Sequence, residues 1–424
     1  MKVLWLSHFV PFPPRGGARQ RSFNLIRFLS QKHEVFLIAL NHSGEPKDLL
    51  SEHVKQLRSC CADVQVWGLP HSWKGLSWWA RLAVSPLRSY PYECLALSSQ
   101  KLVHQWQTTV SNYTGALVHY DSIDLALFFT PPGAHRRTLN HHNCESAMTY
   151  RRAQKEPNLL KKAFLRQQAH KLESLERASC HQFDVNLVVS EADRRNLRSV
   201  NPDAHIHLVE NGTDTDYFTP SKVTPEPMSL IFAGDLSWYP NVSAIQFFVH
   251  EVWPLLKREI PEARLYLAGR LPAPAVVRIA ERVPGIVLAP DPEDIRPWLA
   301  RAEVFVCPIT DGGGTRLKIL DAFAMGKPVV TTTIGCEGIH ATPGDHLLVA
   351  DTPQDFAAQT LLALRDESLR RRLGTRARTL AEQRYNWQII GDQLLRAYNC
   401  ALDRNTCTEG SEGTEFSTRQ SDLI

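Results

Sequence analysis

Short apolar runs alternate with helix-length amphipathic segments along most of the chain. The apolar runs are rich in β-branched residues, which is typical of strands buried on both faces. They lie at residues 2–6, 35–40, 63–67, 116–119, 138–140, 185–189, 206–209, 229–233, 263–268, 286–289, 303–307 and 329–332. Helices are expected at 18–30, 47–59, 124–129, 146–181, 241–258, 274–282 and 293–300, from 354 onward and from 385 to about 402. Since no run leads into a hairpin signal, this pattern predicts an α/β protein with doubly wound parallel sheets.

A polar, proline-rich stretch interrupts the alternation. Residues 219–227 contain three prolines and are typical of a linker. A chain of 424 residues is also too long for one ordinary hydrophobic core. We therefore expect a first domain at 1–218, a linker at 219–228, a second domain at 229–384, a closing helix at 385–404 and a disordered tail at 405–424.

Composition narrows the class of protein. The chain is 43% hydrophobic and 22% charged, as in an average soluble globular protein, and no apolar run is long enough to cross a bilayer. A net charge of +4 is too small to indicate nucleic-acid binding. The nine cysteines are scattered without a CxxC spacing, which favours reduced thiols over a zinc site. Together with the absence of a signal segment, these features predict a cytoplasmic protein.

The strongest chemical signal is a glycine loop that precedes a helix. The segment Gly312-Gly-Gly314 follows the apolar run 303–307 and comes before a helical pattern. Unpaired N–H groups at such a helix start suit a phosphate, and Arg316 and Lys318 add positive charge beside them. The same pattern also fits a glycine-rich turn with two solvated cations.

Two further loops carry polar residues that a ligand would contact. Gly16 and Gly17 stand directly before the first helix, where the backbone can approach a ligand closely. His142 and Glu145 follow the run 138–140, at the edge where open α/β sheets keep their sites. A helix start with Asn143 as its N-cap explains the same residues and is compatible with a site.

Two other patterns are ambiguous. Asp214-Thr-Asp216 has the spacing of a metal site, but it lies in a turn-rich loop without further acids, so we expect turn chemistry, no metal and no cofactor. Trp73, Trp78 and Trp79 occur among basic residues up to Arg88, which suits either an interfacial membrane segment or a helical lid with buried tryptophans.

The stretch from Asp311 to Val330 resembles the retaining glycosyltransferases of family 4, whose GT-B fold consists of two facing Rossmann-like domains. Further landmarks of that family are found at 16–17, 210–214, 232–234, 294–299, 302–306, 335–338 and 385–387, so the resemblance covers about residues 1–402. Residues 235–241 and 142–145 resemble the branch associated with bacterial exopolysaccharide assembly.

The resemblance implies transfer of a hexose from a nucleotide sugar to a glycan or a lipid-linked acceptor. Arg316 and Lys318 are then catalytic partners of the diphosphate, together with His142. Donor contacts would further come from Gly312, Gly313, Gly314, Thr315 and Asp321, and acceptor contacts from Gly16, Gly17, His142 and Glu145. The family has two glutamates spaced eight residues apart; here the first is Gly313 and the second is Asp321.

The same features leave two alternatives open. The missing glutamate at 313 also suits an inactive scaffold that binds a nucleotide sugar or a partner protein. A sugar-nucleotide epimerase uses two such domains as well, although no additional carboxylate cluster favours it. For the glycosyltransferase, we expect reversible contact with the inner membrane surface and no nucleic-acid partner.

Overall fold

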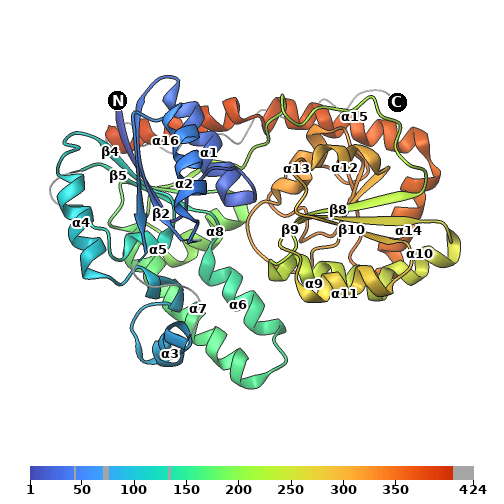
Figure 1. The fold of residues 1–424 in the computed structure, drawn as a ribbon, viewed down its shortest axis with the longest axis horizontal. Coiled ribbons are helices and arrows are strands. Elements are labelled where there is room, and N and C mark those ends of the chain that lie inside the picture. Colours follow the sequence, from blue (N-terminus) through green and yellow to red (C-terminus); the bar gives the residue numbers. More distant parts are fainter. Residues whose placement is uncertain (43, 70–75, 132–134, 404–424) are drawn as a thin grey trace, which may run out of the picture.

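The computed structural model describes residues 1–42, 44–69, 76–131 and 135–403. Two parallel sheets lie on either side of the predicted linker, and helices cover both faces of each (Figure 1). The prediction of two doubly wound parallel sheets is confirmed. The expected tail at 405–424 and the tryptophan at position 73 lie outside the described residues.

The first sheet has seven strands in the order β3-β2-β1-β4-β5-β6-β7, and every neighbouring pair is parallel. The strands are β1 (Lys2–Ser7), β2 (Glu34–Asn41), β3 (Asp63–Gly68), β4 (Leu117–Tyr120), β5 (Arg137–His141), β6 (Val185–Val188) and β7 (Ile206–Leu208). The strand order reverses between β1 and β4. In open α/β sheets a crevice forms at that point, beyond the carboxyl ends of the strands.

The second sheet repeats this plan with six strands in the order β10-β9-β8-β11-β12-β13. The strands are β8 (Ser229–Asp235), β9 (Arg264–Arg270), β10 (Ile286–Pro290), β11 (Val304–Cys307), β12 (Val329–Thr331) and β13 (Leu348–Val349). The order reverses between β8 and β11, next to the glycine loop. The edge strand β13 was not expected, because two residues carry no periodicity.

The helices agree with the amphipathic segments in most places. They are α1 (Gly17–Ser30), α2 (Lys47–Arg58), α3 (Leu76–Val84), α4 (Gln100–Val110), α5 (Ile123–Ala126), α6 (Glu145–Lys155), α7 (Leu159–Cys180), α8 (Glu191–Val200), α9 (Tyr239–Phe247), α10 (Trp253–Glu259), α11 (Pro274–Arg282), α12 (Arg296–Arg301), α13 (Leu317–Ala324), α14 (Pro353–Arg365), α15 (Glu367–Arg384) and α16 (Trp387–Leu402). A π-helical turn, Phe248–Val252, joins α9 to α10.

One predicted helix was wrong. The expected continuous helix at 146–181 is a hairpin of α6 and α7, broken around Pro157. Proline disfavours helical backbone in the residue before it and lacks an N–H, so the first helix ends at Lys155. Asn158 then starts α7 by accepting a hydrogen bond from the N–H of Lys161 at 3.0 Å.

The closing helices tie the two halves together. In Figure 1, α15 runs along the second domain and α16 returns to the first, next to α1. Trp387, Ile390, Leu394 and Tyr398 of α16 are buried in the core of the first domain. The chain after the second sheet therefore completes the first domain.

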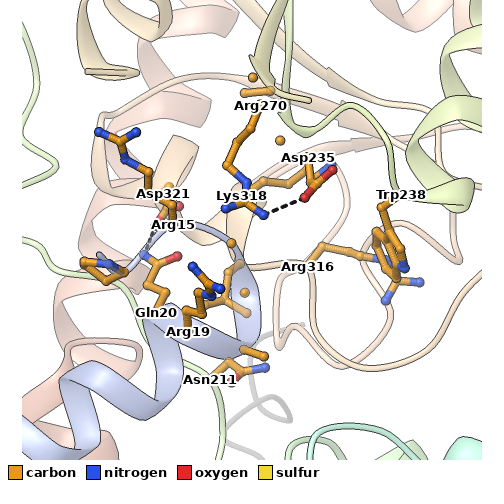
Figure 2. A pocket seen from close by; sticks show the side chains of 18 of the residues that line it. Arg15, Arg19, Gln20, Asn211, Asp235, Trp238, Arg270, Arg316, Lys318 and Asp321 are labelled. Carbon is orange, nitrogen blue, oxygen red and sulfur yellow. Dashed lines mark hydrogen bonds and ion pairs between the residues drawn. The ribbon is translucent and has the colours of Figure 1, made fainter. Parts of the chain in front are cut away.

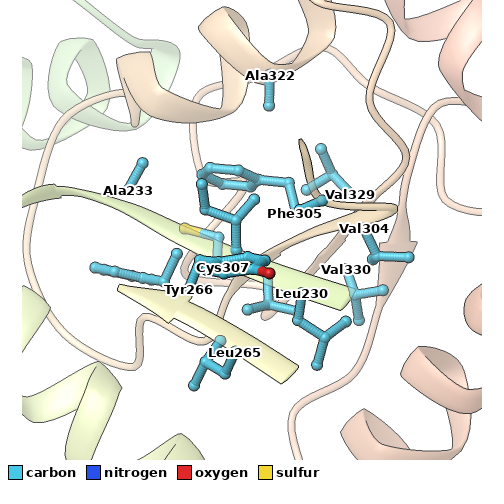
Figure 3. Packing of buried hydrophobic residues seen from close by; sticks show 14 of the residues in the cluster. Leu230, Ala233, Leu265, Tyr266, Val304, Phe305, Cys307, Ala322, Val329 and Val330 are labelled. Carbon is cyan, nitrogen blue, oxygen red and sulfur yellow. The ribbon is translucent and has the colours of Figure 1, made fainter. Parts of the chain in front are cut away.

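Both sheets are buried on two faces, which explains the near-continuous apolar runs. Figure 3 shows the centre of the second core, where Phe305 of β11 and Val329 of β12 lie on the face of the sheet toward Ala322 of α13, and Leu230 of β8 and Val330 of β12 lie on the opposite face. Each of these side chains is buried. Within the described residues, no helix has the length and apolar character needed to cross a bilayer.

Candidate active site

A cavity of about 1040 Å³ opens between the two sheets. The loops after β1, β8 and β11 and the end of β9 line it, so both points of strand-order reversal face the same space. This is the position at which doubly wound sheets bind ligands. Figure 2 shows that basic side chains from both domains point into it, among them Arg15, Arg19, Arg270, Arg316 and Lys318.

The glycine loop between β11 and α13 approaches the first domain closely. Gly314 has φ +66°, and a Cβ there would lie 2.5 Å from Oδ1 of Asn143. A Cβ on Gly313 would meet Asn143 at 3.4 Å and Met148 at 3.5 Å. A Cβ at 313 would thus make only ordinary contacts with the first domain, whereas at Gly314 the positive φ and the close approach of Asn143 both require glycine.

Arg316 precedes α13 and is only 3% exposed. Its Nη1 donates to the carbonyls of Gly313 and Gly314, so the guanidinium shapes the glycine loop. Its Nε and Nη2 have no acceptor among the described residues. Burial lowers the pKa of this guanidinium, and unsatisfied N–H groups of a buried cation are costly. The side chain is thus arranged for an anion.

Lys318 is the second residue of α13 and faces the same space. Its Nζ donates to Oδ1 of Asn241 at 2.6 Å and lies 4.2 Å from the centroid of the Phe232 ring. Burial lowers the pKa of this amine to about 8. An added Cβ on Gly234 would lie 2.8 Å from Nζ, so a larger residue there would displace the amine from this position.

Asp321 lies on the side of α13 that faces the first domain. Its Oδ1 accepts hydrogen bonds from Thr213 Oγ1 at 2.7 Å and from Gln20 Nε2 at 3.2 Å. Burial raises the pKa of the carboxyl to about 7. In this structure the carboxyl therefore joins α1 to α13, at the edge of the cavity.

His142 enters the cavity from the first domain and is held by Asp121. The two side chains are 3.5 Å apart between Nε2 and Oδ1. Asp121 is fully buried and accepts hydrogen bonds from Ser7 Oγ at 3.0 Å and Ser22 Oγ at 2.7 Å. Burial alone would raise the pKa of Asp121, but hydrogen bonds from His142 and Ser22 and the neighbouring imidazole groups lower it overall. The carboxylate therefore orients the imidazole.

Helix α6 brings further cations across to the second domain. Arg151 Nη1 donates to the carbonyl of Gly312 at 2.9 Å and pairs with Glu337 at 3.1 Å. Lys155 Nζ donates to the carbonyl of Thr310. These contacts hold the outer side of the glycine loop against the first domain, so the loop conformation depends on how the domains meet.

The structure brings together most of the predicted site residues. The cavity is lined by Gly16, Gly17, His142, Gly313, Gly314, Thr315, Arg316, Lys318 and Asp321. Gly312 and Glu145 do not line it. The Glu145 carboxyl accepts from Asn143 Nδ2 at 3.0 Å, and burial, with the negative charge of Glu93, raises its pKa to about 8. The predicted N-cap was wrong as well, because Cys144 occupies that position.

The acidic pair in the loop after β7 follows turn geometry. Asp214 Oδ1 accepts from the backbone N–H groups of Asp216 and Tyr217, and its Oδ2 pairs with Arg27 at 2.9 Å. The described part of the chain contains no cluster of three or more His, Cys, Asp or Glu side chains suited to a metal ion. Asp214 is thus occupied by its own turn.

Several cavity residues escaped the sequence-based prediction. Arg270 ends β9 and pairs with Asp235 at 2.8 Å, and Gln20 reaches Asp321 from α1. Arg270 lies two residues after the predicted strand at 263–268, and a cation at the carboxyl end of a strand was a signal that could have identified it. The distance of Gln20 from Asp321 along the chain gave no such signal.

Known proteins resemble this chain in sequence over part of its length. Residues 227–366 match the family described as Glycosyl transferases group 1. An uncharacterized protein from the cps region of Klebsiella pneumoniae is 21% identical over 175 residues, which is 40% of this chain and 45% of that protein. A GDP-mannose-dependent monoacylated alpha-(1-6)-phosphatidylinositol monomannoside mannosyltransferase of Corynebacterium glutamicum is 32% identical over 109 residues, 24% of this chain and 29% of the enzyme. The chain thus aligns with less than half of each of these relatives.

The fold matches over nearly the whole length. Sucrose-phosphate synthase from Thermosynechococcus elongatus superimposes with a TM-score of 0.70 at 17% identity, covering 95% of this chain and 99% of that one. At this identity the likeness extends to the fold alone. Residues 227–366 therefore form a glycosyl transferases group 1 domain, carried on a chain with the GT-B fold of two facing parallel-sheet domains.

Proposed function

We propose that this protein is a retaining, metal-independent glycosyltransferase that moves a hexose from a nucleotide sugar to a glycan or a lipid-linked acceptor. The observation that carries the proposal is the buried Arg316, whose Nε and Nη2 lack acceptors among the described residues while it faces the cavity beside Lys318. A donor diphosphate would supply the missing acceptors.

The chemistry needs charge stabilisation more than it needs a base. Cleavage of the sugar–phosphate bond leaves an oxocarbenium-like sugar and a diphosphate with growing negative charge. Arg316, Lys318 and the glycine-loop amides would stabilise that charge from fixed positions, which is where electrostatic catalysis is most effective. Charge-assisted hydrogen bonds are worth about 1.5–3 kcal/mol each. A resident metal ion is not required for this step.

The acceptor would enter from the first domain. His142 and the glycine pair Gly16-Gly17 line the same cavity from the opposite side. With Nε2 turned toward Asp121, the imidazole offers its other nitrogen to a sugar hydroxyl. Its role would be to position the reacting groups, while the departing diphosphate, whose negative charge grows, would take the proton of the acceptor hydroxyl.

The biological setting is also part of the proposal. The resemblance of residues 235–241 and 142–145 to the exopolysaccharide branch supports a role in surface polysaccharide synthesis, at the cytoplasmic side of the membrane. The GDP-mannose named for the Corynebacterium enzyme supports a nucleotide sugar as donor. The cations and tryptophans around 73–88 support reversible membrane contact.

Release of nucleoside diphosphate from a panel of UDP-, GDP- and ADP-sugars tests the proposal, with and without lipid-linked or oligosaccharide acceptors. We expect acceptor-dependent release from one base family, with the anomeric configuration of the donor kept in the product. Binding of a nucleotide sugar without turnover under any acceptor would instead identify a scaffold, and conversion of the donor to its epimer would identify an epimerase.

A further inference from the structure

Four large apolar side chains are exposed at one end of the first domain. Leu159 is 79% and Leu160 is 85% exposed at the turn between α6 and α7, while Trp79 is 64% and Leu87 is 89% exposed in and after α3. Figure 1 shows α3 and this turn at the same end of the domain, away from α16. Single exposed apolar residues are common, but a group of this size on one protrusion marks an interaction site.

The turn, which we call the hairpin tip (residues 156–162), is a built structure. Asn158 caps α7, and Glu156 accepts from the N–H of Asn158 at 3.2 Å and pairs with Lys161. These contacts place Leu159 and Leu160 in the first turn of α7. Their exposure therefore follows from a capped helix start.

The neighbouring α3 segment is fixed against the same hairpin. Lys171 Nζ on α7 donates to the carbonyl of Ser85 at 2.7 Å, and Gln167 Nε2 donates to that of Pro86 at 3.1 Å. These bonds hold the turn that carries Leu87 along α7. The apolar side chains of both segments thus belong to one protrusion.

The protrusion carries a strong excess of positive charge. Residues 76–88 and 155–171 contain seven Lys and Arg and one Asp or Glu, whereas the whole chain has a net charge of only +4. Lys162 and Arg166 follow the leucine pair on α7, and Arg81 and Arg88 flank the α3 residues. Cations next to exposed leucine and tryptophan side chains are the combination that binds an anionic lipid surface.

We propose that the hairpin tip inserts Leu159 and Leu160 into an anionic lipid bilayer, with Trp79 and Leu87 at the interface beside it. A convex tip with two outward leucines suits a fluid bilayer, because a rigid protein partner would need a matching socket. Only the purpose of this insertion rests on the proposed function. If the protein is a glycosyltransferase, insertion of the tip would bring its acceptor-side domain to a membrane that holds a lipid-linked acceptor.

Co-sedimentation with phosphatidylcholine vesicles, with and without phosphatidylglycerol, tests the insertion. We expect wild-type protein to bind the anionic vesicles and to lose part of this binding in high salt. The double variant Leu159→Ser/Leu160→Ser should bind at least tenfold more weakly, since two buried leucines contribute strongly to partitioning. Leu362→Ser is the matched control, because Leu362 is 46% exposed on α14 of the other domain and should leave binding unchanged.

Hydrogen–deuterium exchange on the unmodified protein gives a second readout. Amides of residues 156–162 should become protected when anionic vesicles are added. Wild-type protein that stays in solution, a double variant that binds as tightly as wild type, or a tip without protection would each overturn the proposal. Loss of self-association in the double variant, without vesicle binding by wild type, would assign the tip to a contact between copies of this chain.

The outcome is separable from that of the proposed function. Nucleoside diphosphate release with a water-soluble acceptor, measured without vesicles, should be the same in the Leu159→Ser/Leu160→Ser variant as in wild type. If vesicle binding fails while this release persists, the membrane proposal falls and the glycosyltransferase proposal stands.

Discussion

Replacing Arg316 by methionine separates a ligand-binding role from a structural one. The buried guanidinium donates to two loop carbonyls, while Nε and Nη2 are without acceptors in the described structure. A buried unsatisfied polar group costs about 1–3 kcal/mol, which roughly offsets the two bonds that the substitution removes. The ligand-free Arg316→Met protein should therefore unfold within about 1 kcal/mol of wild type.

Nucleotide binding should respond far more strongly to the same change. Loss of one charge-assisted hydrogen bond to a phosphate costs about 1.5–3 kcal/mol, so affinity should fall roughly 10- to 150-fold. A ligand present at 100 times its Kd stabilises a protein by about 2.7 kcal/mol, and each tenfold loss of affinity removes about 1.4 kcal/mol of this. Thermal unfolding with and without nucleoside diphosphate measures both quantities, and titration calorimetry gives the affinity directly.

Arg378 supplies the matched control. It donates to the carbonyls of Phe218 at 2.7 Å, Ala324 at 2.6 Å and Thr215 at 3.0 Å, and it does not line the cavity. Arg378→Met should cost about 3 kcal/mol or more of stability, at 1–3 kcal/mol for each carbonyl left without its donor, and spare nucleotide affinity. If Arg316→Met instead lowers the ligand-free Tm as Arg378→Met does and keeps wild-type affinity, Arg316 is a structural brace and the phosphate role is refuted.

Four further outcomes are expected. Burial lowers the pKa of Lys318 to about 8, and a bound diphosphate favours the charged amine, so nucleotide binding between about pH 8 and 9 should be accompanied by uptake of a proton. Calorimetry in buffers of different ionisation enthalpy measures this uptake. The Lys318→Met variant should abolish it, and an unchanged uptake would contradict the phosphate role of Lys318. The folded-state pKa of Asp321, about 7, lies above its usual 3.8, so the unfolding free energy should fall as pH rises from about 4 to 7. The Asp321→Asn side chain still accepts both hydrogen bonds, so this variant should raise Tm at about pH 8 and leave it unchanged at about pH 4. An equal change in Tm at both pH values would refute the raised pKa. Arg151→Glu should lower the turnover rate, because it breaks the contacts that hold the glycine loop against the first domain. Adding Glu337→Arg reverses the ion pair and should restore part of the turnover rate. A double variant as slow as Arg151→Glu alone would mean that this ion pair does not control the position of the glycine loop. Treatment with EDTA should leave transfer activity intact, and loss that Mg²⁺ or Mn²⁺ restores would contradict a metal-independent mechanism.

The alternation of apolar runs and amphipathic segments was sufficient to predict both parallel sheets. Strand and helix periods are local properties, and nearly every run was followed by a crossover segment. Two elements were predicted wrongly or missed. Pro157 divides one expected helix in two, and the two-residue strand β13 is too short to show a pattern and is defined by its pairing with β12. The sequence did not predict that α16 packs into the core of the first domain, because the apolar pattern of an amphipathic helix does not indicate which sheet the helix covers.

In the candidate site too, features set by neighbouring residues in the sequence were predicted, and contacts between the two domains were not. Arg316 and Lys318 were recognisable because cations directly after a glycine loop are unfavourable without an anion. The contact of Asp321 with Gln20, and the hold of Arg151 on the glycine loop, connect residues of different domains. Such contacts depend on how the two domains meet, which spacing along one chain does not encode.

A crystal structure with the nucleoside diphosphate that the donor panel selects tests the central claim most directly. We expect electron density for the diphosphate between the domains, with phosphate oxygens within hydrogen-bonding distance of Arg316 Nη2 and Lys318 Nζ and close to the N–H groups of Gly313 and Gly314. Density for the phosphates elsewhere, with the Arg316 guanidinium still lacking acceptors, would contradict it.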